Sequence, residues 1–205
     1  MKAKHLEILV EEPSMEAFLT KLLPKLVTNG TTFIIHTHQG KHDLLRKLES
    51  RLRAYAKWLP ETARIIVLVD RDKDDCLALK QKLESCAQAA GLSTRTSAGG
   101  DKWRVLNRIA IEELEAWYFG NWAAVKSAFP RVSATVVNRA AYRQSDAITG
   151  GTWEAFERVL MRSGYFAGGM RKVETAMEIG EHFDHAACVS PSFNKFRDGL
   201  TEAVA

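Results

Sequence analysis

The chain has 205 residues, of which 46% are hydrophobic and 26% are charged, and its formal net charge is +4. This composition is typical of a globular protein with one domain, or one domain and a smaller appendage, and it excludes extended disorder. The small positive charge is compatible with a polyanionic partner, but alone it does not indicate one.

Cysteine usage and the first residues of the chain favour a reducing compartment. The three cysteines form no C-x-x-C pair, and Cys76 and Cys86 lie in one predicted helix. Their sequence separation places them ~15 Å apart along that helix, too far for a disulfide. The apolar run after Lys2 and Lys4 covers only residues 8–10, too short for a signal peptide or a membrane span. We expect a cytoplasmic protein with no membrane partner.

Alternating strands and helices in the first part of the chain predict an α/β fold. Short apolar runs alternate with segments whose apolar residues follow helical spacing. This order is typical of a mostly parallel, Rossmann-like sheet flanked by helices and joined by right-handed crossovers. We expect strands at 5–10, 31–37, 64–69, 92–97 and 105–111, helices at about 15–28, 42–59 and 74–90, and a further helix that carries Glu113, Glu115, Trp117 and Tyr118.

Local signals indicate where these helices begin and end. Ser14 is a good N-cap for the first helix, and Asp74 or Asp75 can cap the third. Pro24 is expected to end or kink the first helix, and the pair at 29–30, Asn29 and Gly30, is a stop signal.

The second part of the chain has a mostly helical pattern. We expect an α/β domain at residues 1–122 and a helical C-terminal extension at 123–205 that packs on it, with glycine pairs in its loops. Disorder is expected only at the last few residues, around 202–205.

Two predicted strands end in acidic residues. Glu11 and Glu12 follow the first strand, and Asp70 and Asp72 follow the third. Ligands of parallel sheets bind beyond the carboxyl ends of the strands, and strand alternation would place Asp70 and Asp72 on one side of the chain. Carboxylates this close repel one another unless a cation lies between them, and hard oxygen ligands favour Mg²⁺ or Mn²⁺.

A simpler interpretation of these acids remains open. Asp70 and Asp72 could form a solvated turn that caps the next helix, although Asp74 and Asp75 are better placed for that role. For Glu12 we expect a solvent-facing position in a loop.

Histidine and lysine residues follow the second predicted strand. His36 and His38 have a spacing found in metal ligands, but a lone pair is more often structural. Lys41 can reach a substrate phosphate or remain an exposed lysine before a helix. Further basic residues, Lys172 among them, form either a solvated surface or a track for phosphates.

The segments LVEEPSMEAF and VLVDRDKDD resemble the Toprim fold of topoisomerases, primases and overcoming-lysogenization-defect nucleases. In that fold, a Glu after the first strand and a D-x-D after the third surround Mg²⁺. The resemblance assigns Glu11 to the Glu position and Asp70 and Asp72 to the D-x-D positions.

The segment RIAIEELEAWYFGNW is similar to an uncharacterised bacterial Toprim-like family, a domain of unknown function with an arginine-bearing strand before an E-x-W helix. Some members of the wider group are encoded beside ABC-type ATPases in anti-phage defence modules. The resemblance covers about residues 5–122. The third motif acid is Glu112, Glu113 or Glu115, of which Glu115 fits best, and Glu12 stands where relatives often have Gly.

The resemblance implies a Mg-dependent nuclease or phosphodiesterase that acts on nucleic acid with an ATPase partner. Asp70 and Asp72 would hold Mg²⁺ or Mn²⁺, Glu11 would be a ligand or a general base, and Glu115 would hold a second ion. An acid at the start of a helix also stabilises the helix dipole, which is the alternative for Glu115. Substrate contacts are expected from Lys41, Arg71 and Arg108.

Two other functions remain open. One is a regulatory or partner-binding module that keeps the Toprim shape without cutting. The other is an amidohydrolase-like enzyme that uses His36 and His38.

Overall fold

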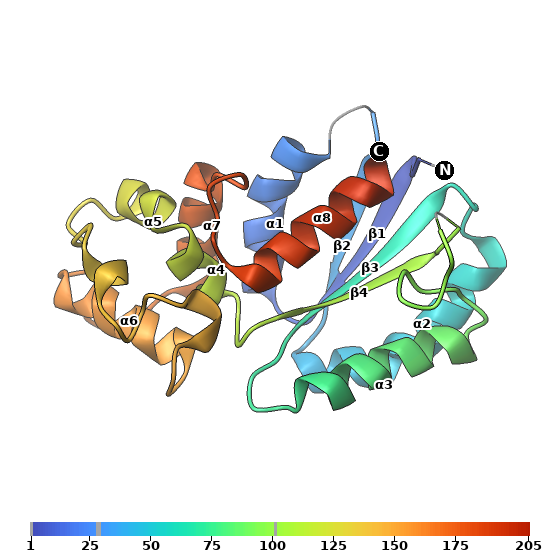
Figure 1. The fold of residues 1–205 in the computed structure, drawn as a ribbon, viewed down its shortest axis with the longest axis horizontal. Coiled ribbons are helices and arrows are strands. Elements are labelled where there is room, and N and C mark those ends of the chain that lie inside the picture. Colours follow the sequence, from blue (N-terminus) through green and yellow to red (C-terminus); the bar gives the residue numbers. More distant parts are fainter. Residues whose placement is uncertain (1, 28–29, 101) are drawn as a thin grey trace.

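Four parallel strands form the sheet at the centre of the protein (Figure 1). The computed structural model describes residues 2–27, 30–100 and 102–205. The sheet has the order β2-β1-β3-β4, and each neighbouring pair is parallel, which confirms the predicted α/β class. The strands are β1 (His5–Val10), β2 (Thr32–Thr37), β3 (Ala63–Asp70) and β4 (Val105–Ala110).

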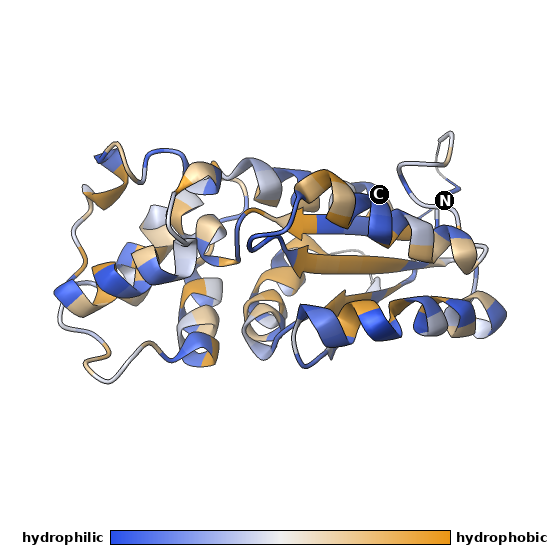
Figure 2. Ribbon diagram, turned by 90° about the horizontal axis from the view of Figure 1, so that it is seen from below, coloured by the Kyte–Doolittle hydropathy of each residue, from blue (hydrophilic) through white to orange (hydrophobic). Residues whose placement is uncertain are grey.

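Helices cover both faces of the sheet. Helices α2 (Lys41–Trp58) and α3 (Cys76–Ala89) lie on one face, and α1 (Pro13–Leu26) and α8 (Pro191–Val204) lie on the other (Figure 1). Alternate residues of β3 belong to two separate buried clusters, one on each face. This burial on both sides explains the unbroken apolar run of β3. Figure 2 shows the hydrophobic strands enclosed between helices whose outer turns are more hydrophilic.

The remaining helices gather beyond the carboxyl ends of the strands, at the left of Figure 1. They are α4 (Glu115–Gly120), α5 (Trp122–Ala128), α6 (Thr152–Arg162) and α7 (Lys172–His182), with short 3-10 turns at Val136–Asn138 and Ser145–Ala147. Helix α7 packs along α1, and one buried cluster extends from β1 and α1 through α4 to α8. The division at residue 122 stays a prediction, and this cluster crosses it.

Some predicted helix ends were wrong. The N-cap of α1 is Glu12, and Ser14 lies in the first turn, where its hydroxyl donates a hydrogen bond to the Glu12 carboxylate. Pro24 does not end α1, which continues to Leu26, while Asn29 lies outside the described residues. Asp75 caps α3 as expected, because its carboxylate accepts a 2.8 Å hydrogen bond from the Ala78 backbone N–H.

Two expectations about irregular segments were also wrong. Residues 92–97 make only an isolated bridge from Thr94 to Val105, because Thr94 and Ser97 bond to each other in a turn. The C-terminal residues are ordered into α8 rather than frayed. Glu202 accepts hydrogen bonds from Trp103 and Arg95, and Val204 is buried.

Within the described part of the chain, no helix is both long enough and apolar enough to cross a membrane.

Candidate functional site

Glu11 and Asp70 lie side by side where the neighbouring strands β1 and β3 end. The backbone N–H of Asp70 donates a 3.3 Å hydrogen bond to Oε1 of Glu11. Both side chains are buried, with exposed fractions of 5% for Glu11 and 4% for Asp70. Within the residues that the structure describes, Oε2 of Glu11 and Oδ1 of Asp70 are buried and accept no hydrogen bond. Unpaired buried oxygens are costly unless a water molecule or an ion pairs with them.

Burial and mutual repulsion make these acids hard to ionise. Burial, with a contribution from the nearby Asp72 carboxylate, raises the pKa of Glu11 to about 7, although Lys41 opposes the shift. Burial also raises the pKa of Asp70 well above its usual range, with Glu11 and Glu115 adding to the shift. A divalent cation would reverse this penalty by stabilising the ionised forms.

Of the three alternatives for the third motif acid, Glu115 is the one whose charge helps to raise the pKa of Asp70. It begins α4, is 4% exposed, and burial raises its pKa to about 8, with Lys172 opposing and Glu113 adding to the shift. The other two alternatives have structural partners. Glu112 forms a 2.6 Å ion pair with Arg71, and Glu113 accepts hydrogen bonds at the start of α6.

Asp72 and Lys41 form an ion pair at the rim of the cluster. The chain leaves β3 at Asp70 and Asp72 has a positive φ of 48°, so strand alternation does not place its side chain. The Lys41 ammonium lies 2.6 Å from Asp72 and 2.7 Å from Asp74, and it also donates to the carbonyls of Asp70 and Arg71. Burial alone would lower the pKa of Lys41. The hydrogen bonds to the Asp72 and Asp74 carboxylates outweigh burial, so the pKa is raised. Lys41 therefore neutralises the loop, and its contact with substrate stays a prediction.

Glu12 and Lys172 belong to the site, although the sequence did not single them out for it. Glu12 is part-buried rather than solvent-facing, and its carboxylate lies 3.8 Å from the Lys172 ammonium. Burial alone would lower the pKa of Lys172. The charges of Glu12, Glu115 and Glu113 outweigh burial, so the pKa is raised. Lys172 also lies 4.4 Å from the Trp153 ring centroid. The only sequence signal for Lys172 was the basic pair that it forms with Arg171 at the start of α7. Its contact with Glu12 joins residues that are far apart in the sequence, so no local pattern predicts it.

The two arginines predicted to bind substrate have other partners. Arg71 bonds to Glu112, and its Nε is buried without a described acceptor. Arg108 lies within β4 under α8 and donates to the backbone carbonyls of Lys195 and Asn107. Among the described residues, Arg108 makes no hydrogen bond or ion pair with the acidic cluster, so the structure does not bring it into the site.

The two histidines of the second strand have separate partners. Nε2 of His36 lies 2.5 Å from Oε2 of Glu7, and Nδ1 of His38 lies 2.8 Å from the carbonyl oxygen of Val10. Neither contact joins the two imidazoles, so the described geometry does not support a shared metal role for them.

The chemistry of the cluster fits a hard divalent cation. Among the residues described, no three His, Cys, Asp or Glu side chains form a preassembled metal-binding group. Mg²⁺ commonly uses one or two carboxylates and takes its other ligands from water and substrate phosphate. The unpaired oxygens of Glu11 and Asp70 match that requirement.

Comparisons with known proteins give a family and a distant structural relative. No curated protein matches the chain. Among solved structures, it is similar to the C-terminal region of the Burkholderia pseudomallei OLD protein, with 18% sequence identity, a TM-score of 0.48 and coverage of 100% of both chains. The model of the domain of unknown function DUF4276 matches residues 10–201, so the chain belongs to that family.

Proposed function

We propose that this chain is a Mg²⁺- or Mn²⁺-dependent phosphodiesterase that cleaves nucleic acid. The observation that carries the proposal is the pair of unpaired buried oxygens, Oε2 of Glu11 and Oδ1 of Asp70. They meet where two parallel strands end, which is the usual position of a ligand in such a sheet.

The residues of the cluster have distinct roles in this proposal. A bound divalent ion lowers the pKa of water and offsets charge on the phosphate. Glu11 and Asp70 hold the ion with Asp72 at the rim, and Glu115 holds a second ion. If Asp70 and Asp72 hold the ion instead, Glu11 would be the general base that accepts a proton from the attacking water. The Lys172 ammonium faces the same acids, where it would bind a phosphate oxygen.

Nucleic acid as substrate and an ABC-type ATPase as partner rest on the resemblance of the acidic motifs. The net charge of +4 is compatible with a polyanionic substrate. An effector role in anti-phage defence and a cytoplasmic location belong to the same proposal.

A cleavage assay tests the proposal. Purified protein is incubated with single- and double-stranded DNA and RNA in Mn²⁺, with and without a candidate ABC-type ATPase partner. We expect metal-dependent cleavage that Asp70→Asn abolishes. Cleavage that is equal in the variant, or that persists in EDTA, would contradict the proposed site.

A non-catalytic regulatory module is the second candidate. It is favoured by the ion pairs that hold Asp72 to Lys41 at the rim. In that case the protein would bind metal at Glu11 and Asp70 but cleave none of the substrates, alone or with the ATPase.

A further inference from the structure

Arg108 is a half-buried cation that makes no ion pair with a described residue. Its Nε donates to the carbonyl of Lys195 at 2.9 Å, and one terminal nitrogen donates to the carbonyl of Asn107 at 3.0 Å. In the part of the chain that the structure describes, no carboxylate lies within ion-pair distance of the guanidinium. Burial lowers the pKa of Arg108, and the more distant Glu202, Glu84 and Asp198 offset this only in part, so the position still favours an anion.

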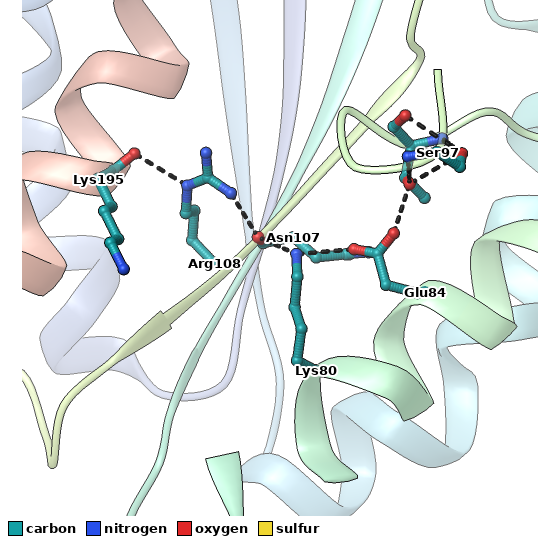
Figure 3. A network of polar contacts seen from close by, with 7 residues as sticks. Lys80, Glu84, Ser97, Asn107, Arg108 and Lys195 are labelled. Atoms are coloured by element: carbon teal, nitrogen blue, oxygen red, sulfur yellow. Dashed lines mark hydrogen bonds and ion pairs between the residues drawn. The ribbon is translucent and has the colours of Figure 1, made fainter. Parts of the chain in front are cut away.

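A second cation meets Arg108 at the same carbonyl. The Lys80 ammonium of α3 donates to the Asn107 oxygen at 2.9 Å, so both positive groups converge on one acceptor (Figure 3). Glu84 forms a 2.7 Å ion pair with Lys80, but it makes no ion pair with Arg108. Burial lowers the pKa of Lys80, and Arg108 is among the charges that lower it further.

These cations line a pocket of about 280 Å³ between α3, β4 and α8. Lys195, on α8, lines it from the other side, and no described residue pairs with its ammonium (Figure 3). The acid in the lining is Asp146, whose two oxygens already accept bonds from the Ser190 hydroxyl at 2.6 Å and the Ser192 N–H at 2.7 Å. The lining therefore carries an excess of positive charge.

The first turns of two long helices add to this charge. The pocket lining includes Cys76 and Leu77 at the start of α3, and Pro191 and Ser192 at the start of α8. Helix N-termini carry partial positive charge and favour anions.

We propose that this pocket binds a phosphate group, held by Arg108 and Lys195 with Lys80 beside them. Arg108 pairs with Leu68 across the sheet, and Ala110 pairs with Asp70, so Arg108 and Asp70 share one face of neighbouring strands. Arg108 therefore lies two residues along β4 from the residue that pairs with Asp70. A backbone phosphate of nucleic acid as the source of the phosphate group rests on the proposed function, whereas a free phosphate does not.

Binding measured in EDTA tests the pocket without any cleavage. The probes are inorganic phosphate, followed by calorimetry, and a fluorescein-labelled single-stranded oligonucleotide without terminal phosphate, followed by anisotropy. The variants are Arg108→Gln and Lys195→Glu. The control is Lys82→Glu, which changes the charge of an exposed α3 lysine outside the pocket lining.

We expect Arg108→Gln and Lys195→Glu each to weaken binding of at least one probe by tenfold or more, with no change for Lys82→Glu. Loss of oligonucleotide binding identifies a backbone phosphate as the source, and loss of phosphate binding alone identifies a small phosphorylated ligand. Lys195 is exposed, so its variant remains informative if Arg108→Gln does not fold.

The proposal is overturned if neither probe binds, or if both bind Lys195→Glu and folded Arg108→Gln as tightly as the wild type. This outcome is separate from failure of the proposed function. If cleavage requires Asp70 but both variants bind the probes as the wild type does, only the pocket is rejected. If the pocket binds phosphate but the protein cleaves no nucleic acid, only the proposed nuclease activity is rejected.

Discussion

The acids at the sheet edge are unfavourable as free carboxylates. Glu11, Asp70 and Glu115 are all buried, and burial is the largest cause of the raised pKa of each. A protein that retains such a cluster needs protons or a cation there. The cluster therefore lowers the stability of the metal-free fold, as the proposed metal site requires.

The stability of the metal-free protein should fall as the pH rises from about 5 to 8. An acid with a raised pKa binds more protons in the folded state than in the unfolded state between its unfolded pKa and its folded pKa. For Glu115 this window runs from 4.5 to about 8, so Glu115 destabilises the fold progressively across it. Glu115→Gln should restore part of the free energy of unfolding that is lost, roughly 1–3 kcal/mol at pH 8.

Thermal unfolding in EDTA at several pH values measures this effect. Burial lowers the pKa of His38, so His38 makes stability rise with pH, opposite to the effect of Glu115. Both proteins contain His38, so the difference between their unfolding curves isolates the effect of Glu115. Parallel curves for the wild type and Glu115→Gln would contradict the assignment.

Lys172 should act on the substrate rather than on the metal. Its ammonium faces Glu12 and the buried acids, so Lys172→Gln should reduce cleavage by about 10²-fold while Mn²⁺ affinity stays unchanged or increases. Kinetics and calorimetry on the same preparation separate the two effects.

The matched control is Arg171→Gln, because Arg171 is exposed and pairs only with Glu174 among the described residues. Equal losses in the two variants would mean that general charge, and not the position of Lys172, is responsible.

At the scale of elements, the sequence predicted the sheet well because its signals are local. The apolar runs of β1 and β3 and the helical spacing of α2 are read within a few residues. The neighbouring positions of Glu11 and Asp70 were predictable for the same reason, because Glu11 directly follows β1 and Asp70 ends β3. The predicted strand at 92–97 failed because the side chains of Thr94 and Ser97 bond to the nearby backbone, which competes with sheet pairing.

The cap of α3 also positions the loop after β3. Asp75→Ala should destabilise the protein by about 1 kcal/mol, because the Ala78 N–H loses its acceptor. Asp75→Asn is the control, since an asparagine oxygen can still accept that hydrogen bond. Denaturant unfolding measures both, and equal stability of Asp75→Ala and the wild type would contradict the assigned cap.

At the scale of the whole molecule, the site depends on residues that are far apart in the sequence. Helix α7 packs along α1 and thereby places Lys172 opposite Glu12 (Figure 1). No local pattern reports this packing, which is why the sequence did not distinguish Lys172 from other basic residues or place Glu12 in the cluster. The position of Arg108 under α8 has the same origin.

A chain that ends at residue 122 should not fold on its own. One buried cluster joins Phe18 of α1 to Trp117, Phe183 and Phe193, so truncation exposes a large apolar surface. Circular dichroism and thermal unfolding of this fragment measure the effect. A cooperative transition like that of the full chain would contradict the prediction and support an independent first domain.

The most direct test of the central claim is a calorimetric Mn²⁺ titration of the wild type and Asp70→Asn, each with and without a non-cleavable oligonucleotide. The account predicts that the wild type binds Mn²⁺ and that the variant binds at least about tenfold more weakly, because a ligand charge is lost. Equal binding by the two proteins, or no binding by the wild type even with the oligonucleotide, would contradict a metal site at Glu11 and Asp70.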